Sequence, residues 1–196
     1  MTTFYICRHG ETENNRNGRL SGWIDTPLTE EGIRNAASSA GKIKNIDFDQ
    51  IISSDMGRAF ITAYLISRDL NYTSPIQRSK DLREVNYGEL ANMPYASYPL
   101  VTPLENADFV APGGESLAQM QQRVLKYLER ISSKNPHKTI LLVAHDGTIN
   151  AIHAQFANEN IGIEDAKSAN KHDFVAKFEY NDVHILSFDE ITSENS

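Results

Sequence analysis

The feature that most constrains the fold of this chain is a regular alternation between two apolar patterns. Short, nearly continuous apolar runs have the length of buried strands. The segments between them repeat apolar residues every three or four positions, as amphipathic helices do. The strand-like runs cover residues 3–7, 50–53, 76–79 and 139–144, and the helix-like segments cover 33–43, 56–66, 117–131 and 149–156. This alternation predicts an α/β fold, a three-layer α/β/α sandwich around a mostly parallel sheet.

The C-terminal part of the sequence departs from the alternation. Residues 174–180 and 183–188 are two strand-like segments around a turn, which predicts a hairpin and an antiparallel edge to the sheet. No repeat, linker or low-complexity segment interrupts the chain, so we expect a single domain over residues 1–196. Within it, the proline-containing stretch 82–112 is expected to form a lid-like excursion, and 192–196 a frayed tail.

The charge of the chain limits its partners. A net charge of -7 gains nothing from a nucleic-acid backbone, so we expect no DNA or RNA partner. An anionic ligand would need a local pocket of basic residues. No apolar run reaches the roughly 20 residues that span a bilayer, and the N-terminus does not resemble a secretory signal. We therefore expect no membrane partner and a cytoplasmic location. The single cysteine, Cys7, lies far from any cluster of metal-ligand type, so no metal is expected.

Polar residues suited to binding a phosphate lie at or shortly after the ends of the predicted strands. They are Arg8, His9, Arg58, Glu84 and His145. Because ligands of open α/β sheets bind beyond the carboxyl ends of the strands, we expect these side chains to converge at one edge. Two arginines, two histidines and one carboxylate would form the basic pocket that an acidic protein needs.

Each of these residues also has an ordinary structural explanation when considered alone. A histidine at a strand end is usually a hydrogen-bonded structural residue, and Arg58 and Glu84 would more often be solvated. The pair Arg8-His9 is harder to explain in this way. Charged groups straight after a buried strand are costly unless they are paired or open into a cleft. The joint placement of these residues therefore favours a site.

The motifs around these residues resemble those of the histidine phosphatase superfamily, the phosphoglycerate-mutase-like proteins. The resemblance is specific because the blocks follow the family's order over about residues 4–150. They are Arg8-His9-Gly10-Glu11-Thr12 with Asn15, Ser21-Gly22-Trp23, Ser53-Ser54-Asp55-Met56-Gly57-Arg58-Ala59, Leu82-Arg83-Glu84, Gly114-Glu115-Ser116 and Ala144-His145-Asp146-Gly147.

The resemblance implies a covalent mechanism. In it His9 attacks the phosphorus and becomes a phosphohistidine, while Glu84 protonates the leaving group and then activates water. The adjacent Arg8 would help to keep the imidazole of His9 neutral. The resemblance also implies the groups that bind the phosphoryl oxygens, which are Arg8, Arg58 and His145, with Asn15, Ser21 and Gly22 adding neutral hydrogen bonds. It implies no metal or other cofactor, because the arginines supply the positive charge.

Departures from the family's motifs favour a phosphatase over a mutase. The superfamily's mutases carry arginines in the insertion that follows the acidic residue, whereas residues 90–118 contain no Arg or Lys. Mutases also have His-Gly-Asn where this chain has His145-Asp146-Gly147. The Trp-Glu-Gly element frequent in the phosphatases is missing as well, from residues 88–92. We therefore expect a phosphomonoesterase acting on a small phosphorylated metabolite.

Two alternatives stay open, a phosphoglycerate-type mutase and a non-catalytic module that binds a phosphate ester or phosphoprotein. Retention of both His9 and Glu84 disfavours the binding module. A moderately apolar group of residues in the excursion could line a leaving-group pocket or simply pack against the core: Tyr87, Met93, Tyr95, Tyr98 and Leu100. The sequence names no substrate, and a homodimer is compatible with it.

Overall fold

The computed structural model describes residues 1–97, 107–161, 171–181 and 184–192. Its strands are β1 (Thr2–Arg8), β2 (Gln50–Ser54), β3 (Gln77–Ser79), β4 (Thr139–Ala144), β5 (Val175–Tyr180) and β6 (Ile185–Glu190). Its α-helices are α1 (Glu13–Arg16), α2 (Glu30–Lys42), α3 (Gly57–Asp69), α5 (Leu117–Lys134) and α6 (Asp146–Ala157). Short 3-10 helices form η1 (Lys80–Leu82), η2 (Gly88–Leu90) and η3 (Tyr95–Ser97). Strands and helices alternate along most of the chain, as predicted.

The strands form one sheet in the order β3-β2-β4-β1-β5-β6. β1, β4, β2 and β3 pair in parallel, whereas β5 runs antiparallel to both β1 and β6. The predicted α/β fold with a mostly parallel sheet is therefore confirmed, and the C-terminal hairpin forms the antiparallel edge. In the central pair Arg8 lies opposite Ala144, so β1 and β4 end at the same level.

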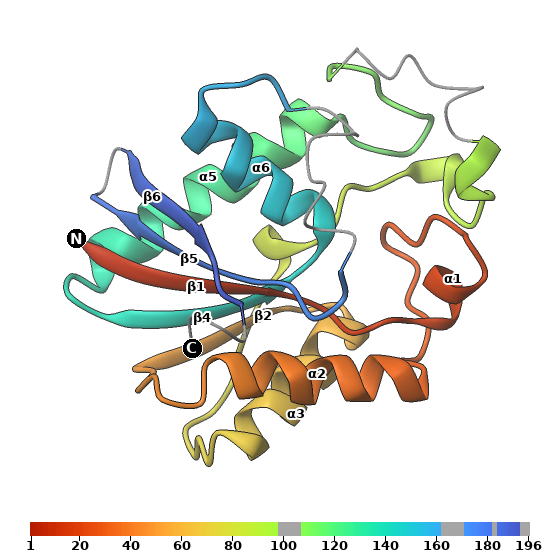
Figure 1. Cartoon of the computed structure of the whole chain (residues 1–196). Coiled ribbons are helices and arrows are strands. Elements are labelled where there is room, and N and C mark those ends of the chain that lie inside the picture. Colours follow the sequence, from red (N-terminus) through yellow and green to blue (C-terminus); the bar gives the residue numbers. More distant parts are fainter. Residues whose placement is uncertain (98–106, 162–170, 182–183, 193–196) are drawn as a thin grey trace.

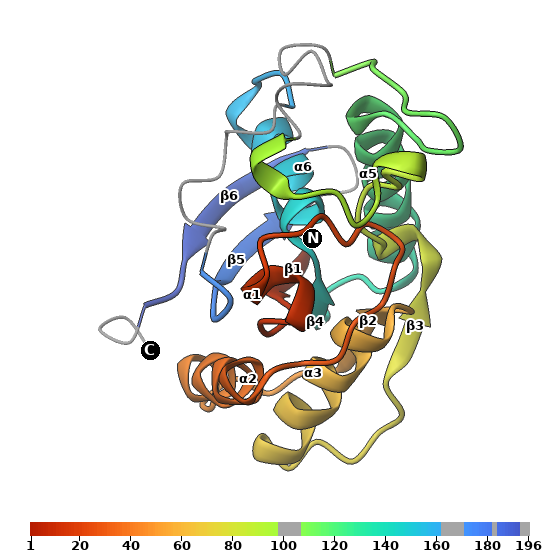
Figure 2. The same ribbon diagram turned by 90° about the vertical axis from the view of Figure 1, so that its right-hand side faces the viewer.

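Helices cover both faces of the sheet, with α2 and α3 on one side and α5 and α6 on the other (Figures 1 and 2). A hydrophobic core lies on each face of the sheet, and β1 contributes side chains to both because successive strand residues point to opposite faces. Phe4 and Ile6 pack in the core that includes α5 and α6, and Tyr5 and Cys7 pack in the core that includes α2 and α3. Burial raises the pKa of the Cys7 thiol to about 12, so it remains a protonated core side chain. None of the described helices is long and apolar enough to cross a membrane.

Side-chain caps fix where two of the helices begin. Thr29 accepts a hydrogen bond from the backbone of Gly32 at the start of α2, as its position before the apolar repeat predicts. Ser116 and Gln119 form a reciprocal capping box at the start of α5. Each such cap typically contributes about 1 kcal/mol to stability. Both helices thus begin where local sequence directs them to begin.

The predicted boundaries differ from the observed ones mainly near turns. The third strand begins at Gln77, and the last strand runs over Ile185–Glu190 where 183–188 was expected. An irregularity in the register at Glu179 and Tyr180 accompanies this shift. η2 and η3 lie within the expected excursion. Residues 98–106, with Tyr98 and Leu100, and residues 193–196 of the expected tail lie outside the described residues.

The loop after β1 packs unusually closely against the first turn of α2. A Cβ atom on Gly10 would overlap the Gly32 carbonyl oxygen, and a Cβ atom on Gly32 would overlap the Glu11 carbonyl oxygen. Two glycines that face each other therefore allow two backbone segments to touch. This contact fixes the loop that follows the carboxyl end of β1.

We predict opposite effects for two glycine substitutions in α2. Gly32→Ala should lower the free energy of unfolding by about 1–3 kcal/mol, because the added methyl group must displace backbone. Gly41→Ala should leave it unchanged or raise it by up to about 1 kcal/mol, because a methyl group there meets no atom within 4 Å. Urea denaturation of both variants measures the difference. Equal effects would show that the close packing at Gly32 is not required.

Candidate active site

Parallel pairing of β1 with β4 sets two histidines side by side at the carboxyl edge of the sheet. The backbone N–H of His9 donates to the carbonyl of Ala144, with 3.0 Å between nitrogen and oxygen. The ring centroids of His9 and His145 lie 5.2 Å apart. The first and fourth strands thus bring together residues that are far apart in the sequence.

The hydrogen bonds of His9 define the tautomer of its ring. Nδ1 lies 2.8 Å from the carbonyl oxygen of Gly10, which can only accept, so Nδ1 carries the proton. Nε2 accepts a hydrogen bond from Nε of Arg58 at 3.2 Å. Burial, followed by the charges of Arg58 and Arg8, holds the pKa of His9 well below its usual range. The ring is therefore neutral, with its lone pair on Nε2.

Arg58 is almost fully buried, and its guanidinium is held in place by oxygen atoms from one loop. It donates to the carbonyls of Gly22 at 2.7 Å and Ile24 at 3.0 Å, and pairs with Asp25 at 3.1 Å. Asp25 also accepts from the backbone N–H groups of Gly57 and Arg58, at the start of α3. This loop therefore orients the guanidinium toward His9.

Glu84 is a buried carboxyl group in the loop after η1. Its Oε1 accepts from the backbone N–H of Val85 at 2.9 Å, and its Oε2 accepts from that of Gly147 at 3.2 Å. Burial, and then the charge of Asp146, raise the pKa of Glu84 above its usual range. Glu84 therefore retains its proton to a higher pH than an exposed glutamate does, as a general acid must.

Residues that sequence reasoning did not assign to the site hold the backbone of Glu84. The indole N–H of Trp23 donates to the Glu84 carbonyl at 2.8 Å. Arg123 donates to the carbonyls of Arg83 at 3.1 Å and Glu84 at 3.4 Å. Glu115 in turn pairs with Arg123. The Gly114-Glu115-Ser116 motif therefore has a physical role, which is to anchor the loop of Glu84.

Gly147 lies where α6 meets that carboxyl group. A Cβ atom on Gly147 would overlap Oε1 of Glu84. The position after His145-Asp146 therefore admits only a glycine while Glu84 keeps this conformation. This contact gives a physical reason for the His145-Asp146-Gly147 order in this chain.

His145 is fully buried, and its Nε2 lies 2.9 Å from the hydroxyl oxygen of Ser54 at the end of β2. Its Nδ1 has no hydrogen-bond partner among the described residues. Burial and the charge of Arg58 hold the pKa of His145 well below its usual range. A third histidine, His172, was not indicated by the sequence; it donates from Nδ1 to the His9 carbonyl at 3.3 Å. Burial lowers the pKa of His172 to about 4.

A cavity of about 100 Å³ opens at this edge of the sheet. All of the predicted site residues line it except His145: they are Arg8, His9, Asn15, Ser21, Gly22, Arg58 and Glu84. Asn15 accepts hydrogen bonds from the backbone and hydroxyl of Thr12, which fixes its amide at the wall. Leu20, Tyr87, Tyr95, Asp146 and a further cation, Arg19, complete the lining.

The remaining contacts of the cavity modify two expectations from the sequence. Arg8 pairs with Asp146 at 3.8 Å and Arg58 pairs with Asp25 at 3.1 Å, so both of the predicted arginines are partly neutralised. Arg19 donates to the carbonyl of Asn92 and brings a positive charge beside the cation-free stretch 90–118. Met93 does not line the cavity, whereas Tyr87 and Tyr95 do. The described residues contain no cluster of three or more side chains suited to a metal ion.

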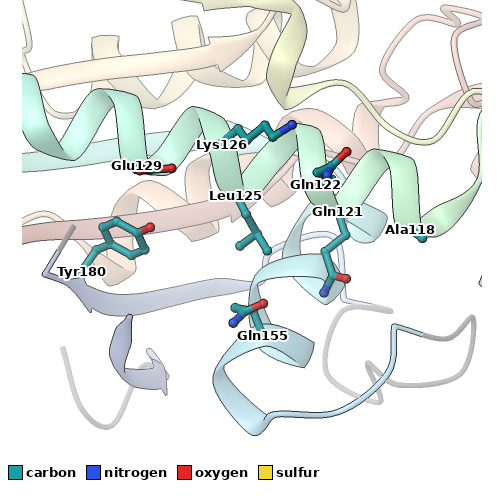
Figure 3. Close-up of a pocket in the computed structure, with 8 residues that line it drawn as sticks. All are labelled: Ala118, Gln121, Gln122, Leu125, Lys126, Glu129, Gln155 and Tyr180. Atoms are coloured by element: carbon teal, nitrogen blue, oxygen red, sulfur yellow. The ribbon is translucent and has the colours of Figure 1, made fainter. Parts of the chain in front are cut away.

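A larger hollow of about 340 Å³ lies elsewhere, along α5 (Figure 3). Its lining comes from α5, α6 and β5 and consists mainly of Gln121, Gln122, Leu125, Lys126, Glu129, Gln155 and Tyr180. None of the predicted site residues lies in it. The chemistry of the lining, rather than the size of the hollow, therefore identifies the candidate active site.

Comparisons with known proteins agree with the geometry. The sequence model of the histidine phosphatase superfamily (branch 1) matches residues 4–184. The chain belongs to this superfamily. An uncharacterized phosphatase, PhoE, from Bacillus subtilis (strain 168) is 29% identical over 170 residues, which cover 87% of this chain and 85% of that protein. A superfamily relative from Cytophaga hutchinsonii, a 2,3-bisphosphoglycerate-dependent phosphoglycerate mutase, is 31% identical over 78% of this chain and 76% of that protein.

A solved structure of the superfamily fold supports the same architecture. YhfR from Bacillus stearothermophilus superposes with a TM-score of 0.83 at 26% identity, covering 94% of each chain. The family resemblance stated from the motifs is thereby confirmed. Proteins similar to this chain carry the names of both phosphatases and mutases.

We predict that His9 stays neutral in the free protein through the pH range in which an exposed histidine gains its proton, because its burial and the nearby arginines hold its pKa well below the usual range. Long-range proton–nitrogen NMR spectra of labelled protein should show a protonated Nδ1 and an unprotonated Nε2. The signals that vanish in a His9→Ala variant assign the ring, and the urea-unfolded protein supplies the ordinary titration. Titration of His9 in the folded protein at its ordinary value would contradict the geometry.

Proposed function

We propose that this protein is a phosphomonoesterase that hydrolyses a small phosphorylated metabolite through a phosphohistidine at His9. One observation carries the proposal. A neutral, buried imidazole presents its Nε2 lone pair beside Arg58, in a cavity that also holds a carboxyl group whose pKa is raised. A nucleophile, a cationic binding site and a proton donor in one cavity are the parts that ester cleavage requires.

In the first step, Nε of Arg58 transfers its hydrogen bond from Nε2 of His9 to a phosphoryl oxygen. The freed lone pair on Nε2 attacks phosphorus and forms a P–N bond. The ester P–O bond breaks, and its electron pair leaves with the alcohol oxygen. Glu84 gives its proton to that oxygen, so the alcohol departs neutral. The carbonyl of Gly10 stabilises the charge that the imidazole gains, because it accepts a hydrogen bond from Nδ1–H throughout.

In the second step, water attacks the phosphohistidine. The Glu84 carboxylate takes a proton from the water while the water oxygen bonds to phosphorus, and the P–N electron pair returns to Nε2. Inorganic phosphate leaves, and both His9 and Glu84 regain their starting protonation states. The same carboxyl group therefore acts as acid and then as base, which its buried position favours.

Arg8 and Arg58 bind the phosphoryl oxygens and stabilise the charge that develops on them. Asn15, Ser21 and Gly22 add neutral contacts from the cavity wall. His145 does not line the cavity, but its ring centroid lies 5.2 Å from that of His9. Its Nδ1, which has no hydrogen-bond partner among the described residues, supplies a further hydrogen-bonding group to a phosphoryl group bound at His9. Loss of one preorganised donor of this kind typically costs about 10²–10³ in rate. The two arginines provide the positive charge, so this mechanism uses no metal or other cofactor.

Hydrolysis is favoured over mutase activity because residues 90–118 contribute no cation to a second anionic group. Two observations support the mutase alternative. Arg19 lines the cavity and could bind the second anionic group of a mutase substrate, and one of the relatives is named as a phosphoglycerate mutase. A module that only binds phosphate would need the arginines, but it would not need a buried carboxyl group beside the histidine.

We expect p-nitrophenyl phosphate to be hydrolysed with the same rate in the presence and absence of EDTA. His9→Ala should lower the rate by about a thousandfold or more, because the nucleophile is lost. His184→Ala, which removes an exposed histidine, should not change it. A rate equal in wild type and His9→Ala would contradict the proposal, and loss of activity in EDTA would contradict the metal-free mechanism.

A second assay distinguishes the mutase alternative from the phosphatase. The protein is given 3-phosphoglycerate with a trace of 2,3-bisphosphoglycerate, and both 2-phosphoglycerate and free phosphate are measured. Faster release of free phosphate supports the phosphatase. Faster formation of 2-phosphoglycerate would replace it with the mutase.

A further inference from the structure

A second, smaller cavity adjoins the phosphate cavity on the side of Glu84. It measures about 50 Å³, room for only a few heavy atoms, since one water needs about 10–15 Å³ of such space. Glu84, Tyr87, Tyr95 and Asp146 line both cavities. Because Glu84 protonates the departing alcohol in the proposed mechanism, this second space lies where the alcohol half of the ester must sit. We refer to it as the leaving-group cavity.

Two residues that line the leaving-group cavity, Asp146 and Asn150, carry buried hydrogen-bond acceptors that no described residue satisfies. Asn150 is 7% exposed, and its side-chain oxygen is buried without a hydrogen-bond partner among the described residues. Oδ1 of Asp146 likewise has no hydrogen-bond donor there, and Arg8 approaches it only to 3.8 Å. A buried acceptor without a donor is costly, so such a cavity favours a ligand that brings N–H or O–H groups.

The charge and the lining of this cavity further limit which ligand it can bind. Of the described residues that line it, none is an arginine or lysine, and Asp146 is an acid. Tyr87 and Tyr95 contribute aromatic rings, which attract cations through their faces. Leu117 and Ile161 supply apolar surface for a short carbon chain. An anionic substituent would meet an acid and unsatisfied acceptors, whereas an ammonium group would satisfy them.

We propose that the leaving-group cavity selects a small alcohol that carries a protonated amine, with Asn150 as the residue that recognises the amine. The substrate class is then the phosphate monoesters of short amino alcohols. This inference rests on the proposed phosphatase function, since it names the alcohol half of that reaction.

Three esters of nearly equal size test the inference. They are 2-aminoethyl phosphate, n-propyl phosphate and phosphoglycolate, whose substituents are cationic, neutral and anionic. We expect kcat/KM to be about tenfold or more higher for the aminoethyl ester than for the propyl ester, because its N–H groups satisfy buried acceptors. Phosphoglycolate should be the poorest substrate. p-Nitrophenyl phosphate serves as the common reference for active protein.

Substitution of Asn150 separates recognition from folding. The ratio of kcat/KM for the aminoethyl and propyl esters, measured in one preparation, does not depend on how much of it is folded. Asn150→Leu should remove most of the preference, and Asn150→Asp should keep or increase it. Gln155→Leu makes a similar change on an exposed position of the same helix and should leave the ratio unchanged.

The outcomes that overturn the inference differ from those that overturn the proposed function. Equal use of the aminoethyl and propyl esters, or a preference unaffected by Asn150→Leu, contradicts amine recognition while hydrolysis stands. If phosphoglycolate is the best of the three substrates, amine recognition is also contradicted, and Arg19 is the residue that binds the carboxylate. Turnover of p-nitrophenyl phosphate without turnover of any of the three esters contradicts it as well. If none of the esters is hydrolysed, p-nitrophenyl phosphate included, both the inference and the proposed function are overturned.

Discussion

Parallel pairing of β1 with β4 is the constraint on which the rest of the site depends. With Arg8 opposite Ala144, the two strands end together, and the residues that follow them, His9 and His145, become neighbours. β1 is buried on both faces, so this register cannot slip without exposing one core or the other. The two hydrophobic cores therefore hold His9 and His145 in place.

A cationic cavity in an acidic protein depends on how its arginines are held. Arg58 is nearly inaccessible to solvent, and burying a charge of this kind is costly unless hydrogen bonds replace its water. The carbonyls of Gly22 and Ile24 and the carboxylate of Asp25 provide them. Because the protein itself supplies these contacts, the guanidinium needs little rearrangement to stabilise a transition state. The same contacts help to keep His9 neutral, since Arg58 faces its Nε2.

The sequence predicted the elements and the principal residues of the site because both follow from local pattern. Apolar periodicity located β1, β4 and the helices, and the rule that ligands bind beyond strand ends placed Arg8, His9 and Glu84 together. Partners joined only by the tertiary fold could not be predicted in this way. Trp23 and Arg123 reach the backbone of Glu84 from distant segments, and no local pattern marks such contacts. Arg19 was missed for the same reason, although it lines the cavity. Strand ends near turns also shifted, as at β6.

The central claim is that His9 carries the phosphoryl group between two steps that both use Glu84. The most direct measurement uses the Glu84→Gln variant and p-nitrophenyl phosphate labelled at phosphorus. The reaction is stopped rapidly with alkali, and the labelled peptide is identified by peptide mapping. Because p-nitrophenolate leaves without an acid while water still needs a base, label should accumulate, and it should be found on the peptide that contains His9. Label on another residue, or turnover by this variant at the wild-type rate without any trapped phosphohistidine, would contradict the account.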